Sequence, residues 1–202
     1  MKISLDLHDF SVLNNRMELL FRLRDHFPGF KVSLFTVPND IKSDWGFSTI
    51  RDKPLKVIKD NLDWMQLIPH GLNHAGSEMR NCDNNTFRLN VIPKIKQAFD
   101  RDGLPFVEGF CPPHWKWSQG VVKALNEAGW WGAIDRNKPN MFATKRFYRY
   151  SHNIDELLEG ELLKLHGHVY GTKNDLGECF GNLLTLPTDA EWHFITDFIE
   201  EK

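Results

Sequence analysis

The 202-residue chain has few cysteines, little net charge and no long apolar run, and each shortage excludes a class of protein. Its cysteines, Cys82, Cys111 and Cys179, are odd in number and too widely spaced for a disulfide framework. A formal charge of −2 gives no electrostatic reason to expect a nucleic-acid or membrane partner. No apolar stretch approaches the roughly 20 residues of a membrane span. The N-terminus, MKISLDLHDF, is too acidic for a signal peptide, so we expect a soluble, cytoplasmic protein without a transmembrane segment.

The chain has the composition of an ordinary globular domain, with 41% hydrophobic and 26% charged residues. Its length is enough for one sizeable core, and we expect residues 1–202 to form a single domain. The oligomeric state cannot be predicted from this pattern.

Short β-rich runs alternate with helical patterns from end to end. Strands are predicted at 2–8, 30–36, 64–69, 105–110, 130–134, 146–150 and 161–166. Helices are predicted from about Val12 to Leu23 and at 54–63, 86–99, 120–128, 154–160 and 188–201. This alternation indicates an α/β fold with a largely parallel sheet, either open and doubly wound or closed into a small barrel.

Two of the helices carry terminal signals. Ser118 is a good N-cap for the helix at 120–128, and Gly129 supplies its stop, which makes this the clearest helix in the chain. Thr86 is a candidate cap for the helix at 86–99, which Pro93 must kink or divide.

Five of the nine histidines follow directly on predicted strands, where α/β proteins collect their functional side chains. In HGLNH, His70 and His74 are four residues apart, so one helical turn or tight loop can bring both rings to one metal ion. Two imidazoles and a carboxylate are a common ligand set for zinc or a similar ion. Asp9 or Asp6, from the first strand, can supply the carboxylate. By chance alone, an HxxxH pair is more often unrelated to metal.

Four segments in chain order resemble the motifs of the NodB-type polysaccharide deacetylases, the carbohydrate esterase family 4 group. HGLNH (70–74) looks like the HxxxH metal motif. LDLHDF (5–10) resembles the first motif, usually written TFDDG. GFCPPHWKWS (109–118) is similar to the RxPxG segment, and LLKLHGH (162–168) to the late LLxH motif. The resemblance implies a small distorted (β/α)7 barrel that deacetylates a sugar with the help of a metal ion.

The resemblance also assigns roles to residues. His70, His74 and Asp9 match the metal ligands, and His166 matches the catalytic acid. His8 stands where the family has the aspartate that serves as general base. A histidine can accept a proton near neutral pH, so His8 is one candidate base. Asp6 is the other, because side chains at 6 and 8 leave an extended strand on the same face.

The third motif in chain order, GFCPPHWKWS (109–118), differs from the family pattern. Cys111 replaces the arginine that orients the base, and a small buried thiol is its simplest interpretation. Pro113 restricts the backbone so that the amide of His114 can face a developing oxyanion. Trp115 and Trp117 offer aromatic faces that suit a sugar ring, although tryptophan is more often part of the core.

Two further residues are candidates for the pocket. Asp135 follows the strand at 130–134 and is either the carboxylate partner of His166 or part of a solvated turn. His168 lies two residues beyond His166, on the same face of the strand.

The resemblance therefore implies a metal-dependent hydrolase that removes an acetyl group from an N-acetylated sugar. The metal would be Zn²⁺, with Co²⁺ or Ni²⁺ as alternatives, and the substrate a carbohydrate or sugar conjugate used in surface-polysaccharide synthesis. Two alternatives stay open: hydrolysis of non-sugar amide bonds on the same scaffold, and carbohydrate binding without catalysis.

Overall fold

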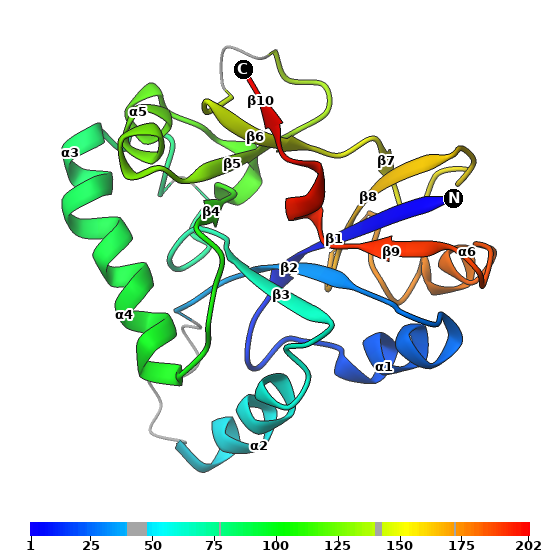
Figure 1. Ribbon diagram of the computed structural model, residues 1–202. Coiled ribbons are helices and arrows are strands. Elements are labelled where there is room, and N and C mark those ends of the chain that lie inside the picture. The colour runs from blue at the N-terminus through cyan, green and yellow to red at the C-terminus, as the bar shows by residue number, and fades with distance from the viewer. Residues whose placement is uncertain (40–47, 77, 140–142, 172) are drawn as a thin grey trace.

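A computed structural model describes residues 1–39, 48–76, 78–139, 143–171 and 173–202 (Figure 1). The strands are β1 (Lys2–Phe10), β2 (Val32–Thr36), β3 (Met65–Pro69), β4 (Gly109–Phe110), β5 (Trp131–Ile134), β6 (Arg146–Arg149), β7 (His152–Asn153), β8 (Leu162–His168), β9 (Glu191–His193) and β10 (Glu200–Glu201). The helices are α1 (Met17–His26), α2 (Ser48–Lys59), α3 (Asn84–Thr86), α4 (Ile92–Asp102), α5 (Gln119–Ala128) and α6 (Phe180–Leu183). None of these described helices is both long and apolar enough to cross a membrane.

The strands form two sheets with the helices packed around the outside (Figure 1). One sheet has the order β3-β2-β1-β8-β7, with β9 also paired to β1, and the other has the order β10-β6-β5-β4. All pairs are parallel except β10 with β6. The predicted α/β fold with a mostly parallel sheet is therefore confirmed.

The two sheets meet beside the predicted metal motif. His70, just after β3, forms an isolated parallel bridge with Cys111, just after β4. The amide of Cys111 donates to the carbonyl of Pro69 at 3.1 Å. Within the described residues no continuous hydrogen-bond ladder joins β3 to β4 or β6 to β7. The (β/α)7 barrel is therefore distorted, and its two sheets do not form one closed ring of paired strands.

The central strand β1 explains how polar side chains come to lie inside the fold. It is buried along almost its whole length because β2 and β8 flank it. Ile3, Leu5 and Leu7 belong to the main hydrophobic core. Asp6 and His8 point to the opposite face, because side chains alternate along a strand, and both are almost fully buried.

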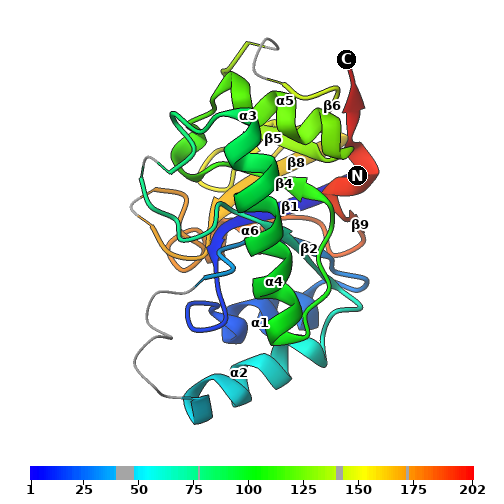
Figure 2. The same ribbon diagram turned by 90° about the vertical axis from the view of Figure 1, so that its left-hand side faces the viewer.

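The helix signals are confirmed for α5 and corrected for the helix around Pro93. The hydroxyl of Ser118 accepts from the amide of Val121, and Gly129 ends the helix at φ 76°. The second helix is capped by Asp83 rather than Thr86, and a π-helical turn (Phe87–Val91) precedes α4. Figure 2 shows α3 and α4 in one line. The π turn lengthens the hydrogen-bond spacing just before Pro93, which lacks an N–H to donate and falls in the first turn of α4.

The predicted C-terminal helix at 188–201 is wrong. The segment forms β9, a 3₁₀ turn (Ile195–Phe198) and β10 instead. Trp192 packs its ring 5.0 Å from that of Phe27 and 4.8 Å from that of Phe30, on a strand paired with β1. Pairing with an existing sheet therefore outweighed the helical spacing of the apolar residues.

Smaller corrections concern element boundaries. The segment 154–160 is not helical, and there the Glu156 carboxylate accepts from the amide of Asn153 at 3.1 Å. Helix α1 starts at Met17, later than predicted, and α2 starts earlier and contains Pro54. Of the predicted strand at 105–110 only the last two residues are paired.

Candidate metal centre and active site

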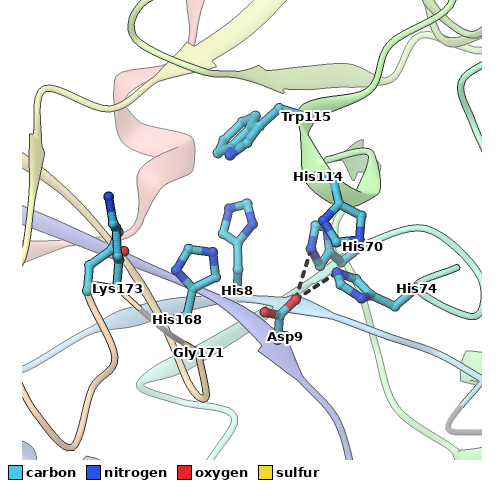
Figure 3. Close-up of a pocket in the computed structure, with 10 residues that line it drawn as sticks. His8, Asp9, His70, His74, His114, Trp115, His168, Gly171 and Lys173 are labelled. Atoms are coloured by element: carbon cyan, nitrogen blue, oxygen red, sulfur yellow. Dashed lines mark ion pairs between the residues drawn. The ribbon is translucent and has the colours of Figure 1, made fainter. Parts of the chain in front are cut away.

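The three predicted metal ligands converge at the ends of β1 and β3. Asp9 Oδ1 lies 2.8 Å from His74 Nε2 and 3.3 Å from His70 Nε2 (Figure 3). Neither contact is aligned as a hydrogen bond, so this buried carboxylate oxygen has no hydrogen-bond partner in the described structure. One oxygen and two imidazole nitrogens that face a common point, with all three atoms within 4.8 Å of one another, fit a divalent metal ion.

Unusual backbone conformations bring these side chains together. Asp9 has φ 62° and His74 has φ 56°, both in the left-handed region. In a regular strand residues 8 and 9 would face opposite sides. The register between β1 and β2 shifts between Leu7 and Phe10. This irregularity and the left-handed Asp9 turn its carboxylate into the same cavity as His8.

The loop that carries the two histidine ligands (residues 70–76, the ligand loop) is held by contacts that the sequence analysis did not predict. His70 Nδ1 lies 3.0 Å from the carbonyl oxygen of Cys111, which fixes the ring and leaves Nε2 facing Asp9. The Glu78 carboxylate accepts from the amides of Leu72 at 2.9 Å and Asn73 at 3.2 Å. In the sequence, the position of Glu78 four residues after His74 is the one feature that could have indicated this contact.

Gly71 is required in this loop. It has φ +68°, and a Cβ there would lie 2.0 Å from Glu78 Oε1 and 2.6 Å from Pro113 Cγ. A side chain would therefore be strained and would also displace the carboxylate that holds the loop.

A cavity of about 500 Å³ opens beside the triad. Its lining contains most of the predicted site, with Trp115 on one side and Lys173 on another (Figure 3). The lining residues are His8, Asp9, His70, His74, His114, Trp115, His168, Gly171, Lys173 and Asn174. A pocket of this size can hold a sugar ring with its substituents.

Behind the cavity wall lies a buried pair of predicted catalytic residues. His166 Nδ1 lies 2.7 Å from Asp6 Oδ1, and a carboxylate can only accept, so Nδ1 is the protonated nitrogen. His8 Nε2 lies 3.4 Å from the same oxygen without hydrogen-bond geometry. The ring of His8 is 4.5 Å from His166 and 4.9 Å from Trp115. His8 therefore separates the Asp6–His166 pair from the cavity.

The carboxylate partner of His166 is Asp6 and not Asp135, because the Nδ1 of His166 is bonded to Asp6. Asp135 caps its own turn by accepting from the amide of Asn137 at 2.7 Å. Its second oxygen lies 3.2 Å from the hydroxyl of Tyr150, whose ring stacks 4.5 Å from His166. Asp135 thus reaches His166 through Tyr150 and not directly. Tyr150 follows β6 directly, so the rule of strand ends that selected the histidines would have found it.

The third motif contributes mainly through its backbone and rings. Pro113 is buried, and His114 and Trp115 have φ 55° and 56°. The exposed His114 ring lies 5.1 Å from His74. Cys111 is fully buried, and burial raises the pKa of its thiol well above the usual value, so it is no nucleophile.

The charges of the site follow from burial and proximity. Burial would raise the pKa of Asp9, but its contacts with His70 and His74 outweigh this and lower it well below the usual range. The contact with Asp9 raises the pKa of His74. Burial, followed by the nearby histidines, lowers the pKa of His8, and the same causes lower that of His168 to about 4.

No protein-family model and no curated protein sequence matches this chain. Its structure is nevertheless similar to solved structures. A family 4 carbohydrate esterase from Streptomyces lividans, in complex with acetate, is 14% identical, with a TM-score of 0.57 over 91% of this chain and 86% of that chain. A family 4 acetyl xylan esterase from Clostridium thermocellum, in complex with a cobalt ion, is 12% identical, with a TM-score of 0.55 over 98% of this chain and 89% of that chain.

A third similar structure is a family 4 pseudoenzyme from Bacillus anthracis, 12% identical, with a TM-score of 0.60 over 97% of this chain but 64% of that chain. A mutant of that protein is described as having restored enzymatic activity. These likenesses show that the chain has the fold of the family 4 carbohydrate esterases, which confirms the resemblance at the level of fold. They include proteins named as esterases and one named as a pseudoenzyme, so the activity has to be argued from the site.

Proposed function

We propose that the chain is a metal-dependent deacetylase that hydrolyses the acetyl group of an N-acetylated sugar. The observation that carries the proposal is the convergence of Asp9, His70 and His74 at the cavity of this fold. Neighbours of the same fold are described with acetate and with a cobalt ion, which agrees with such a reaction. The whole chain would form the catalytic domain.

Asp9, His70 and His74 would hold the metal, with Zn²⁺ the expected ion and Co²⁺ or Ni²⁺ as alternatives. A divalent ion in such a site polarises the substrate carbonyl and makes bound water acidic enough to attack at neutral pH. The chain's own contribution is to fix the ligands through Glu78 and the Cys111 carbonyl before the ion arrives.

His8 is the better of the two candidate bases. It lines the cavity, whereas Asp6 is bonded to His166 and does not line it. His8 therefore accepts the proton of the attacking water. The Asp6 oxygen 3.4 Å from His8 Nε2 stabilises the charge that the ring gains.

His166 is the proposed proton donor to the departing amine. Asp6 accepts from its Nδ1, which leaves Nε2 to carry the mobile proton. His168 is the alternative, since it lines the cavity, but with a pKa of about 4 it is neutral at pH 7. His166 is buried behind His8, which separates it from the cavity, so the donor role requires the His8 ring to shift when substrate binds.

The remaining pocket residues would bind the substrate. The His114 amide would face the tetrahedral oxyanion, and Trp115 would pack against the sugar ring. A cytoplasmic sugar conjugate used in surface-polysaccharide synthesis stays our expectation for the substrate.

The test combines metal content with acetate release. Purified chain should contain close to one equivalent of Zn²⁺, Co²⁺ or Ni²⁺ by mass spectrometry, and the variant His70→Ala/His74→Ala should lose it. The matched control is His26→Ala/His193→Ala, which removes two histidines outside the cluster and should keep the metal. Wild-type protein that binds metal should release acetate from N-acetylglucosamine oligomers, and protein that stays empty after soaking with these ions would rule the proposal out.

A second candidate function is carbohydrate binding without catalysis. It is favoured by His8 and Cys111, which replace the base and the arginine of the family motifs, and by the similar pseudoenzyme. It predicts binding of N-acetylated oligosaccharides that survives chelation, with no acetate released. Acetate release from small non-sugar amides, with none from sugars, would instead favour the other hydrolase.

A further inference from the structure

A second pocket, of about 210 Å³, shares Trp115 with the main cavity. Three separate segments of the chain line it: Arg80 follows the ligand loop, Lys116 and Trp117 belong to the third motif, and Lys138 follows β5. The lining therefore consists of three cations and two indole rings. Among the described residues that line it, none is acidic.

No carboxylate among the described residues neutralises the positive charges of this pocket. Lys116 Nζ donates to the carbonyl oxygen of Gly76 at 2.9 Å, which fixes the ammonium group without cancelling its charge. Across the parts of the chain that the structure describes, Arg80 and Lys138 have no ion-pair partner. By contrast, Arg136 is paired with Glu156. The chain as a whole has a net charge of −2, so this pocket is locally positive on a slightly negative protein.

The two indole rings are held in place from behind. Trp115 packs 4.9 Å from His8 and 5.9 Å from Tyr150, by ring centroids. Trp117 packs 6.2 Å from Phe110. Both remain partly exposed, so each can offer an aromatic surface to a ligand.

We propose that this pocket is a subsite for a sugar unit that carries an anionic group, either a carboxylate or a phosphate. Trp115 and Trp117 pack against the sugar ring, and Arg80, Lys116 and Lys138 bind the anion. The orientation of the substrate rests on the proposed function: its N-acetylated unit lies in the main cavity, and its acidic unit lies on the other side of Trp115, in the second pocket. The substrate is then an acidic glycan or phosphorylated sugar rather than a neutral polymer.

Binding of matched probes to the metal-loaded full chain tests the subsite without depending on catalysis. The first pair is hyaluronan tetrasaccharide, which alternates N-acetylglucosamine with uronic acid, and neutral chitotetraose. The second pair is glucose 6-phosphate and glucose, which have no N-acetyl group to draw them into the main cavity, and comparison of the pairs separates carboxylate from phosphate. Calorimetry at low salt should show about fivefold or greater preference for the charged member of at least one pair, which collapses at about 0.5 M salt.

The test variant is Arg80→Met/Lys138→Met, and the matched control is Lys94→Met/Arg146→Met, which removes one lysine and one arginine exposed elsewhere. The test variant should lose the preference and the control should keep it. Arg80→Lys/Lys138→Arg keeps both charges and should bind as wild type, which guards against a misfolded test variant.

The outcomes separate the subsite from the activity. A charge preference that the test variant loses supports the subsite, even if no acetate is released and the proposed deacetylase function fails. Equal affinity for both members of each pair, or equal loss in test and control variants, overturns the subsite. Acetate release from chitotetraose and hyaluronan tetrasaccharide with equal kcat/KM also overturns it, while leaving the deacetylase function intact.

Discussion

Asp6 and His166 are register partners on the neighbouring strands β1 and β8, and their side chains meet with 2.7 Å between Oδ1 and Nδ1. They are 160 positions apart in the chain, and both are almost fully buried. Because the contact joins two paired strands rather than two loops, the hydrogen-bond ladder itself fixes its geometry. The pair is therefore prearranged before any substrate binds.

Asp6→Asn should lower kcat for deacetylation by about 10²-fold or more while the metal content stays at the wild-type level. The amide keeps the shape but lacks the charge that holds His166 in the protonated-Nδ1 form. Asp135→Asn is the control, because Asp135 is bonded to Tyr150 rather than to His166, and its effect should be much smaller. Equal losses in the two variants would contradict the assignment of Asp6 as the partner of His166.

Glu78→Gln should weaken metal binding by about 10–100-fold with little change in thermal stability. A glutamine side chain can accept with one oxygen only, whereas Glu78 accepts from two loop amides. Competition with a chelator measures the affinity, and a melting curve measures the stability. Glu108→Gln changes an exposed surface carboxylate and should alter neither. An unchanged metal affinity in Glu78→Gln would show that the loop holds itself.

Gly71→Ala should destabilise the fold by more than Gly29→Ala does. Both glycines have left-handed backbones, at φ +68° and +74°, so both variants have the strain of roughly 1–2 kcal/mol expected there. Only at Gly71 would the new Cβ collide, with Glu78 and Pro113, whereas nothing lies within 4 Å at Gly29. Denaturant unfolding of the two variants measures the difference, and equal losses would mean that the collision is relieved at no cost.

Glu156 should contribute stability that depends on acid pH. Its hydrogen bonds with Arg136 lower its pKa from 4.5 to about 2. A carboxylate with a lowered folded-state pKa stabilises the protein fully above its unfolded value and loses this contribution as the pH falls through the folded value. Relative to Glu156→Gln, the wild type should be more stable by about 1 kcal/mol at pH 7, after allowance for solvent exposure.

That difference should fade between about pH 4.5 and pH 2. Urea unfolding of both proteins across this range provides the measurement. A difference that stays constant through the range would show that Glu156 acts by packing and not by charge.

Elements whose signals are local could be predicted from the sequence. The α5 helix has its cap, its stop and its apolar spacing within a dozen residues, and it forms as predicted. The candidate metal ligands His70 and His74 could also be predicted, because they lie four residues apart in one loop directly after a strand. Their proximity to the end of β1, which carries Asp6 and Asp9, follows from the rule that parallel strands end at one edge.

Interactions between distant segments depend on how the strands pair in the folded protein. The spacing of apolar residues in 188–201 suits a helix, yet the pairing of β9 with β1 and of β10 with β6 made the segment extended. The choice of Asp6 over Asp135 as the partner of His166 depends on the register between β1 and β8, which no local pattern encodes. The bulge that turns Asp9 toward the histidines is likewise a property of the paired strands, since a strand in isolation would keep alternating.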